Sequence, residues 1–436
     1  MSGRIPPYST VRILGSTSLY PQDPPLALLH GDSLKTTLYR GFRECACALD
    51  YCPQVSTSHN VNRTIHSLPM NVFLRCSCTI KGVAFALLCV ACAAESSRDR
   101  QLEIVAELSQ GPGNVAITPD GRAIVSQHVL FRPEMRVVEI LPDGSVRPFP
   151  NKQWASERDE EGVGLDDVLG IQSGQDGIVW MLDNGRRGSR LVAWDTNKDR
   201  LHRIIELGPP ARARGSFFND IALDPVHNSI FISDASAKNA AIVVVDMQTS
   251  VSRRVLERHA SVMAEPIAMV IGGKSYSVDK DGRPVARVGV DGITIDPQSE
   301  WVYYGASQST DLWRIRASDL VDATLTDFEL AARIERYGSR PVCDGITIDS
   351  AGNVYITDLT NFAVGVVNAS GEYRILHQDE RLLSWPDGMS FGPDGYIYVV
   401  ANQLHLSAPF NRGQDLSKPP FYLLRFPALA PGAVGR

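Results

Sequence analysis

Nine acidic and amide side chains recur at matching positions along this 436-residue chain, and they are the residues best suited to chemistry. Each stands where a predicted strand begins or where the following strand ends. A concave rim of carboxylates concentrates ligands of opposite charge, and crowded carboxylates raise one another's pKa values unless a cation lies among them. The pattern therefore predicts a site for a cation, either an organic amine or a metal ion. The candidate residues are Asp183, Asn219, Asp220, Asp234, Asp291, Asp344, Asp358, Asp387 and Asn402.

The elements that must position these residues are copies of one β-hairpin. In the clearest copy, Ile346 and Ile348 share one face, a turn follows at Gly352-Asn353, and residues 354–357 form a β-branched and aromatic strand. Copies begin at residues 114, 169, 220, 291, 344 and 387. Repeats of roughly 40 to 50 residues with four strands each are typical of propeller blades. The sequence therefore predicts an all-β fold, a six-bladed β-propeller.

A propeller must close its ring so that no long strand edge stays exposed. Residues 102–108 precede the first copy, and residues 421–426 follow the last. We expect these two segments to pair and complete the sixth blade. The extra length before residue 291 contains Gly272-Gly273-Lys274 and residues 279–282, which predict a hairpin loop over the ring.

The hairpin geometry predicts where the acidic residues gather. In an antiparallel hairpin, residues equally far from the turn lie opposite each other, so the start of the first strand pairs with the end of the second. Six polar pairs would then surround one mouth of the channel. A second interpretation stays open, because Asp-Gly before a strand is good turn chemistry and the aspartates could instead fasten each blade. The predicted pairs are Asp344 with Asp358, Asp220 with Asp234, Asp291 with 306–307, Asp387 with 401–402, Gly170 with Asp183, and Asn114 with 127–128.

Two histidines follow ends of second strands. His128 and His405 could therefore reach the rim, where one could act as a general base, although packing is the commoner role. No Gly-x-Ser-x-Gly or His-x-x-x-His pattern supports a serine hydrolase or a zinc peptidase.

The amino-terminal region differs from the repeats. Residues 1–69 hold no copy of the hairpin and are predicted to be disordered or an overextended start. Residues 70–93 resemble a signal peptide, with Arg75 and Lys81 before a short apolar run that ends in Ala91-Cys92-Ala93. A signal anchor or a buried helix is the alternative. We expect residues 94–436 to form the propeller, secreted or periplasmic and free of the membrane after cleavage.

Charge and cysteine content limit the partners. The net charge of −6 comes without a basic stripe, which argues against nucleic acid as a partner. Cys343 is the one cysteine beyond the predicted cleavage site, so no disulfide framework is expected. We expect a monomer whose partner is a small molecule.

Several segments occur in a fixed order along the chain: 170–171 with 180–185, 216–224 with 232–236, 291–293 with 302–307 and 312–315, 344–346, and 385–388 with 401–404. In this order they resemble the yellow and major royal jelly protein family over about residues 102–426. The resemblance implies a secreted six-bladed propeller that binds small molecules at one face of its channel, with links to amine binding and dopachrome conversion. Because few members have an assigned catalytic activity, whether this chain is an enzyme stays open. Paired cysteines common in animal members are absent, which suggests a bacterial-type member.

A second resemblance is to gluconolactonase and regucalcin-like propellers. Their divalent metal is held by a Glu of the first blade and by an Asn and an Asp of later blades, which Asn219 and Asp344 match. Residues 111–114, Gly-Pro-Gly-Asn, offer no counterpart of the Glu. We therefore expect no metal cofactor, with Ca²⁺ or another divalent cation as the alternative. Three functions remain: a small-molecule binder or tautomerase-like isomerase, a metal-dependent lactone hydrolase, and an interaction scaffold.

Overall fold

The computed structural model describes residues 101–185, 187–276 and 287–436. The predicted disordered start, the predicted signal peptide and residues 279–282 lie outside these ranges. No helix in the described ranges is both long and apolar enough to cross a membrane.

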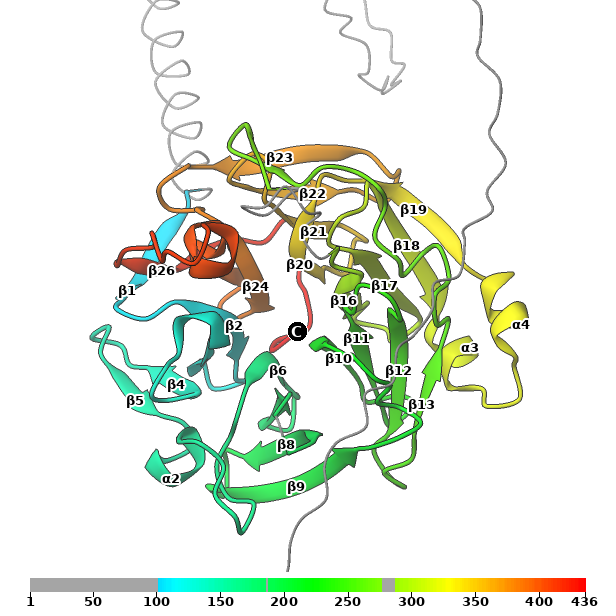
Figure 1. Ribbon diagram of the computed structural model, residues 1–436, viewed down its shortest axis with the longest axis horizontal. Coiled ribbons are helices and arrows are strands. Elements are labelled where there is room, and N and C mark those ends of the chain that lie inside the picture. Colours follow the sequence, from blue (N-terminus) through cyan, green and yellow to red (C-terminus); the bar gives the residue numbers. More distant parts are fainter. Residues whose placement is uncertain (1–100, 186, 277–286) are drawn as a thin grey trace, which may run out of the picture. The chain divides into compact units, whose positions relative to one another are not determined.

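The described residues form six four-stranded antiparallel sheets arranged as a ring, which confirms the six-bladed β-propeller (Figure 1). Blade 1 is β2 (Pro112–Ile117), β3 (Ala123–Gln127), β4 (Val137–Ile140) and β5 (Val146–Pro148); blade 2 is β6 (Val168–Ser173), β7 (Ile178–Asp183), β8 (Ser189–Asp195) and β9 (Arg200–Leu207). Blade 3 is β10 (Phe218–Asp224), β11 (Ser229–Asp234), β12 (Ala241–Asp246) and β13 (Ser252–Val255); blade 4 is β16 (Val290–Ile295), β17 (Trp301–Ala306), β18 (Asp311–Arg316) and β19 (Glu335–Ser339). Blade 5 is β20 (Cys343–Ile348), β21 (Val354–Asp358), β22 (Ala363–Val367) and β23 (Tyr373–Gln378); blade 6 is β24 (Pro386–Phe391), β25 (Tyr396–Ala401), β26 (Phe421–Pro427) and β1 (Glu103–Leu108).

Short elements connect or cover the blades. The predicted hairpin at Gly272-Gly273 is present as β14 (Val270–Ile271) and β15 (Lys274–Ser275). The helical segments are η1 (Val129–Phe131), α2 (Lys152–Ala155), α3 (Ala317–Val321), α4 (Asp327–Ala331), η2 (Leu404–Leu406) and η3 (Ala408–Phe410).

The ring closes as predicted, through the pairing of the first strand with the last. β1 runs antiparallel to β26, with Glu103 opposite Arg425 and Leu108 opposite Phe421. The Arg425 guanidinium donates to the Glu103 carboxylate at 2.8 Å. The sixth blade therefore contains both ends of the propeller chain, so separating the ends requires breaking a sheet.

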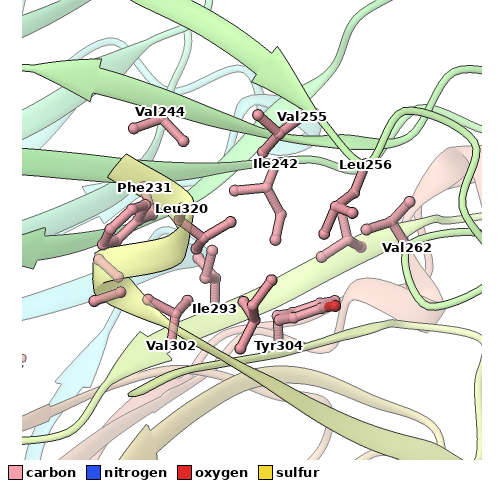
Figure 2. Close-up of a cluster of buried hydrophobic side chains, with 14 of the residues drawn as sticks. Phe231, Ile242, Val244, Val255, Leu256, Val262, Ile293, Val302, Tyr304 and Leu320 are labelled. Carbon is pink, nitrogen blue, oxygen red and sulfur yellow. The ribbon is translucent and has the colours of Figure 1, made fainter. Parts of the chain in front are cut away.

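Apolar side chains fill the spaces between blades. Between blades 3 and 4, Phe231 and Ile242 pack against Ile293 and Tyr304, and Leu320 of α3 covers them (Figure 2). Burial of a side chain of this size contributes about 1.5 to 3 kcal/mol. The alternation read from the sequence thus becomes the packing that holds neighbouring blades together.

Every innermost strand carries a β-bulge near its first residue. The register between the first and second strands shifts at the same place in all six blades, so the first strand has one extra residue there and two of its residues lie opposite one residue of the second strand. Hydroxyl groups of the second strands satisfy freed backbone groups, since Ser233 Oγ accepts from Asp220 N and Thr357 Oγ1 accepts from Asp344 N. Bulges of this kind redirect side chains.

The predicted pairing of strand ends is wrong, because the bulge changes which residues lie opposite each other. Asp358 lies opposite Cys343 rather than Asp344, and Asp234 lies opposite Phe218 rather than Asp220. The prediction assumed that every residue of the first strand has a partner in the second strand, whereas each bulge adds one residue to the first strand. The residues that begin the repeats therefore leave the sheet and turn toward the centre.

Neighbouring bulges touch one another around the ring. A Cβ on Gly292 would lie 2.7 Å from the Asp344 carbonyl oxygen, and one on Gly345 would lie 2.6 Å from that of Asp387. Real Cβ atoms do not approach so closely, so the glycine of each Asp-Gly pair permits the contact. This contact brings the aspartates of successive blades close together.

The carboxy-terminal segment runs to the centre of the ring (Figure 1), and its contacts lie at the strand ends away from the bulges. Residues 431–436 contact the far ends of innermost strands: Ser173 N and Phe391 N donate to the carbonyl oxygens of Gly435 and Arg436. The Thr347 hydroxyl also donates to Arg436 O, at 3.2 Å. The channel is therefore blocked at the end away from the bulges.

We expect Gly435→Ala to destabilise the propeller more than the matched variant Gly413→Ala. Both glycines have left-handed φ angles, 88° and 85°, for which an added Cβ costs roughly 1 to 2 kcal/mol. A Cβ on Gly435 would also lie 2.2 Å from Ser173 O, whereas one on Gly413 meets nothing within 4 Å. Overpacking should add about 1 to 3 kcal/mol at Gly435. Denaturant unfolding of both variants checks this, and equal losses would contradict the described contact.

Candidate binding site

A cavity of about 220 Å³ lies at the bulged ends of the innermost strands. One part of its lining is polar and includes the redirected residues Asn114, Asn219, Asp220, Asp291, Asp344 and Asp387. The other part is apolar and includes Leu130, Phe217, Met269, Val288, Trp385 and Phe410. The site therefore combines a cluster of carboxyl groups with a hydrophobic wall.

Each of the four carboxyl groups accepts a hydrogen bond from a neutral side chain. In the described ranges, none of them forms an ion pair with a lysine or arginine. The donors are Asn114 Nδ2 to Asp220 (2.6 Å), Trp385 Nε1 to Asp344 (2.6 Å), Asn402 Nδ2 to Asp387 (2.7 Å) and Asn219 Nδ2 to Asp291. The hydrogen bonds fix the orientation of the carboxyl groups without neutralising them.

Burial raises the pKa of all four carboxyl groups above the ordinary range. The pKa of Asp344 rises to about 6 and that of Asp220 to about 8. The pKa values of Asp291 and Asp387 are raised well above 3.8, first by burial and then by the charges of the neighbouring aspartates. The four groups therefore do not all ionise together near neutral pH. A cation among them would favour the ionised forms.

The two candidate histidines occupy different places. His128 lines the cavity, and its Nδ1 accepts from Leu130 N at 3.2 Å, so this nitrogen caps η1. His405 lies behind Trp385, with ring centroids 6.1 Å apart and rings nearly parallel. Burial lowers the pKa of both histidines to about 4, so both are neutral at physiological pH.

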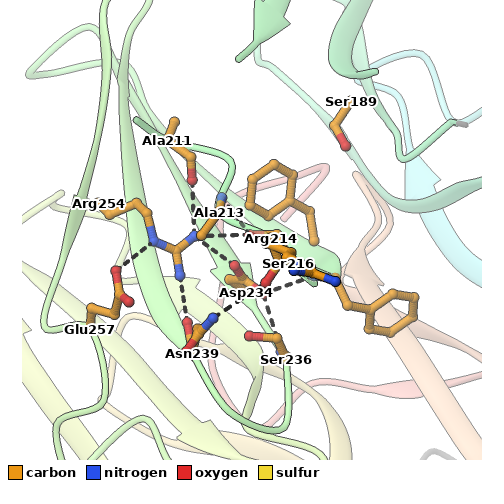
Figure 3. A network of polar contacts seen from close by, with 12 residues as sticks. Ser189, Ala211, Ala213, Arg214, Ser216, Asp234, Ser236, Asn239, Arg254 and Glu257 are labelled. Atoms are coloured by element: carbon orange, nitrogen blue, oxygen red, sulfur yellow. Dashed lines mark hydrogen bonds and ion pairs between the residues drawn. The ribbon is translucent and has the colours of Figure 1, made fainter. Parts of the chain in front are cut away.

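The remaining predicted site residues lie outside the cavity lining and fasten loops. Asp234 accepts from Phe217 N and Ser236 N and forms an ion pair with Arg254 at 2.6 Å (Figure 3). Asp183 pairs with Arg190 at 3.0 Å and accepts from the backbone of residues 166–167.

The other two follow the same pattern. Asp358 accepts from Tyr373 Oη and Asn361 N, and Asn402 supports Asp387 from behind. The residues at the ends of the second strands thus hold loops in place, which is the second interpretation that the sequence allowed. The bulge residues of the first strands line the cavity.

Two contributors to the cavity were not among the nine candidate residues. Asn114 was predicted at the channel mouth as a member of the first polar pair, and it does line the cavity. The apolar wall comes from segments outside the repeats, including η1 and η3. Trp385 precedes Pro386-Asp387 and has a φ of 60°, which turns its indole toward the centre.

A metal ion is the alternative occupant, and Asn219 and Asp344 both line the cavity. Oxygen donors of this kind suit Ca²⁺, which takes six to eight of them. The described residues nevertheless include no group of three or more His, Cys, Asp or Glu side chains placed to hold a metal ion. The described lining of the cavity contains no Glu to match the Glu of the lactonase-like metal set, and a metal ion stays the alternative occupant.

Comparison with protein families matches residues 172–415, more than half of the chain, to the family described as major royal jelly protein. A search of curated protein sequences returns no significant match.

Solved structures of several other propellers are similar to the fold. One is a gluconolactonase from Xanthomonas campestris, with 12% identity and a TM-score of 0.47, over 75% of this chain and 90% of that chain. Another is a calcium-binding regucalcin from Agrobacterium tumefaciens, with 14% identity and a TM-score of 0.46, over 77% and 97%. A third is virginiamycin B lyase from Staphylococcus aureus, with 15% identity and a TM-score of 0.44, over 70% and 95%. None of these similarities assigns a function to this chain.

We expect Asp220→Asn and Asp234→Asn to change stability in opposite directions. The folded protein holds a proton on Asp220 up to a pKa of about 8, whereas the unfolded chain releases it near 3.9, so this group lowers stability progressively as pH rises between these values. Asp220→Asn removes this loss and should stabilise the protein by about 1 kcal/mol or more at pH 8, with the gain shrinking toward pH 4. Asp234→Asn leaves the Arg254 guanidinium without its buried partner and should cost about 3 kcal/mol.

Denaturant unfolding at several pH values measures both effects. A loss of stability in Asp220→Asn at pH 8 comparable to that in Asp234→Asn would show that Asp220 is also a structural fastener.

Proposed function

Because the chain belongs to the major royal jelly protein family, we propose that it binds a small organic cation with an aromatic or apolar body at the bulged strand ends. The observation that carries this proposal is the cluster of four carboxyl groups that line one cavity without an ion-pair partner among the described residues. An ammonium group supplies the missing charge and several hydrogen-bond donors, and the apolar wall accommodates the rest of the ligand.

Closure of the channel supports binding rather than passage. The carboxy-terminal segment blocks the end opposite the bulges, so a ligand reaches the carboxyl groups from the bulged end. Trp385 orients Asp344 and also lines the apolar wall, which links recognition of charge to recognition of an aromatic body. The predicted signal peptide at 70–93 would place this binding outside the cytoplasm, in a monomeric protein that is secreted or periplasmic.

The same carboxyl groups support a tautomerase-like isomerase activity as an extension of binding. A tautomerisation removes a proton from one atom of the substrate and returns a proton to another, so atoms and electrons balance without a further reactant. Near pH 7, Asp344 with a pKa of about 6 is mainly ionised and suited to accept a proton. Asp220 with a pKa of about 8 is mainly protonated and suited to donate one.

We expect saturable binding of dopamine or tryptamine in the presence of EDTA, measured by calorimetry. Affinity should rise from pH 5 to pH 8 as the carboxyl groups ionise, and should fall with salt. Asp291→Asn removes one buried charge-assisted contact of about 1.5 to 3 kcal/mol and should weaken binding roughly 10- to 100-fold. Asp143→Asn, in the exposed turn between β4 and β5, is the matched control and should bind as the wild type does.

Two other outcomes would replace the proposal. Lactone hydrolysis that EDTA abolishes and Ca²⁺ restores would identify a metal-dependent lactonase. Absence of both amine binding and lactone hydrolysis, together with loss of stability in Asp291→Asn, would identify a scaffold in which the aspartates only fasten blades.

A further inference from the structure

A second, larger hollow of about 1140 Å³ adjoins the cavity. The two share Val129, Leu130 and Phe410 in their linings. We call this hollow the outer chamber; its lining comes from residues 129–132, 274–276 and 408–416. A ligand whose charged end reaches the four carboxyl groups can therefore extend past these apolar residues into the chamber.

The charged side chains of the outer chamber have the opposite sign to those of the cavity. Arg132, Lys274 and Arg412 line it, with Asp415 as the one carboxylate in its described lining. Asp415 already accepts from Ser417, through both the backbone N–H and the hydroxyl group. Among the described residues, none of the three cations is paired with a carboxylate. The site is therefore acidic inside and basic outside.

The cationic side of the chamber rests on a packed support. Lys274 Nζ lies 4.8 Å from the centroid of the Tyr276 ring, and Tyr276 packs edge-on against Phe410 at 6.0 Å. The turn before Lys274 is fixed by close packing, because a Cβ on Gly272 would lie 2.5 Å from Phe362. These contacts hold the strand that carries Lys274 beside the apolar wall shared with the inner cavity.

We propose that the natural ligand is zwitterionic: an aromatic amine that carries an anionic group, such as a sulfate or phosphate ester, at the end far from its nitrogen. This inference rests on the proposed function, since the ammonium group occupies the inner carboxylates. The anionic group then lies among Arg132, Lys274 and Arg412. Opposite charges placed at the two ends also fix the orientation of the ligand, which a uniformly acidic pocket would not do.

Tyramine and tyramine O-sulfate form a matched pair that tests this inference, because they differ only in the distant anionic group. Calorimetry should give at least tenfold tighter binding of the sulfate ester by the wild-type protein. The triple variant Arg132→Gln, Lys274→Gln, Arg412→Gln should lose this preference and bind tyramine as well as the wild type does, or better. Arg374→Gln, on exposed β23, is the matched control and should keep the preference.

The outcomes separate this inference from the proposed function. Equal affinity for the two compounds would contradict the proposal of a zwitterionic ligand and leave amine binding intact. An equal loss of affinity for both compounds in the triple variant would show that the three cations support the chamber structurally. That result would also contradict the zwitterionic ligand. Failure of both compounds to bind the wild type at pH 8 and low salt would overturn the proposed function and this inference together.

Discussion

Neighbouring innermost strands touch through their bulges, and this contact sets both the ring and the cavity. The glycine of each Asp-Gly pair lets the backbone of the next blade approach, as at Gly292 against Asp344 and Gly345 against Asp387. The residue before each of these glycines is an aspartate that the bulge turns out of the sheet. The contact that packs the blades therefore also brings their carboxyl groups close together. Repulsion between these groups when they are ionised destabilises the centre of the structure. Strain concentrated at one place in an otherwise regular fold is a common mark of a functional site.

Aspartates at the two ends of the same hairpin consequently have different physical roles. At the end of the second strand, Asp183 and Asp234 are fully buried, paired with arginine and bonded to backbone N–H groups, so their charges are satisfied within the protein. At the bulge, Asp220 and Asp344 have no cationic partner among the described residues, and burial raises their pKa values to about 8 and about 6. The first group stabilises loops, whereas the second group gains most from an added cation.

The sequence was sufficient to predict the blade number, the hairpins and the pairing of residues 102–108 with 421–426, because period-two alternation and turn residues are local signals. It misplaced the pairing of Asp344 with Asp358, because the bulge adds one residue to the first strand and the alternation along the rest of that strand gives no sign of it. The apolar wall and the outer chamber could not be predicted, since η1, η3 and the β14–β15 hairpin lie outside the repeat. The position of residues 431–436 could not be predicted either, because their sequence carries no strand pattern. These residues nevertheless form hydrogen bonds to four blades.

The central claim is that a ligand cation takes the place of protons among the buried carboxyl groups. Calorimetric titration of tyramine at pH 7, repeated in buffers with different ionisation enthalpies, counts the protons exchanged per ligand bound. Because burial raises the pKa values of all four carboxyl groups, to about 8 at Asp220, and a bound cation favours their ionised forms, we expect a net release of protons. Binding with no proton exchange, or with proton uptake, would contradict it.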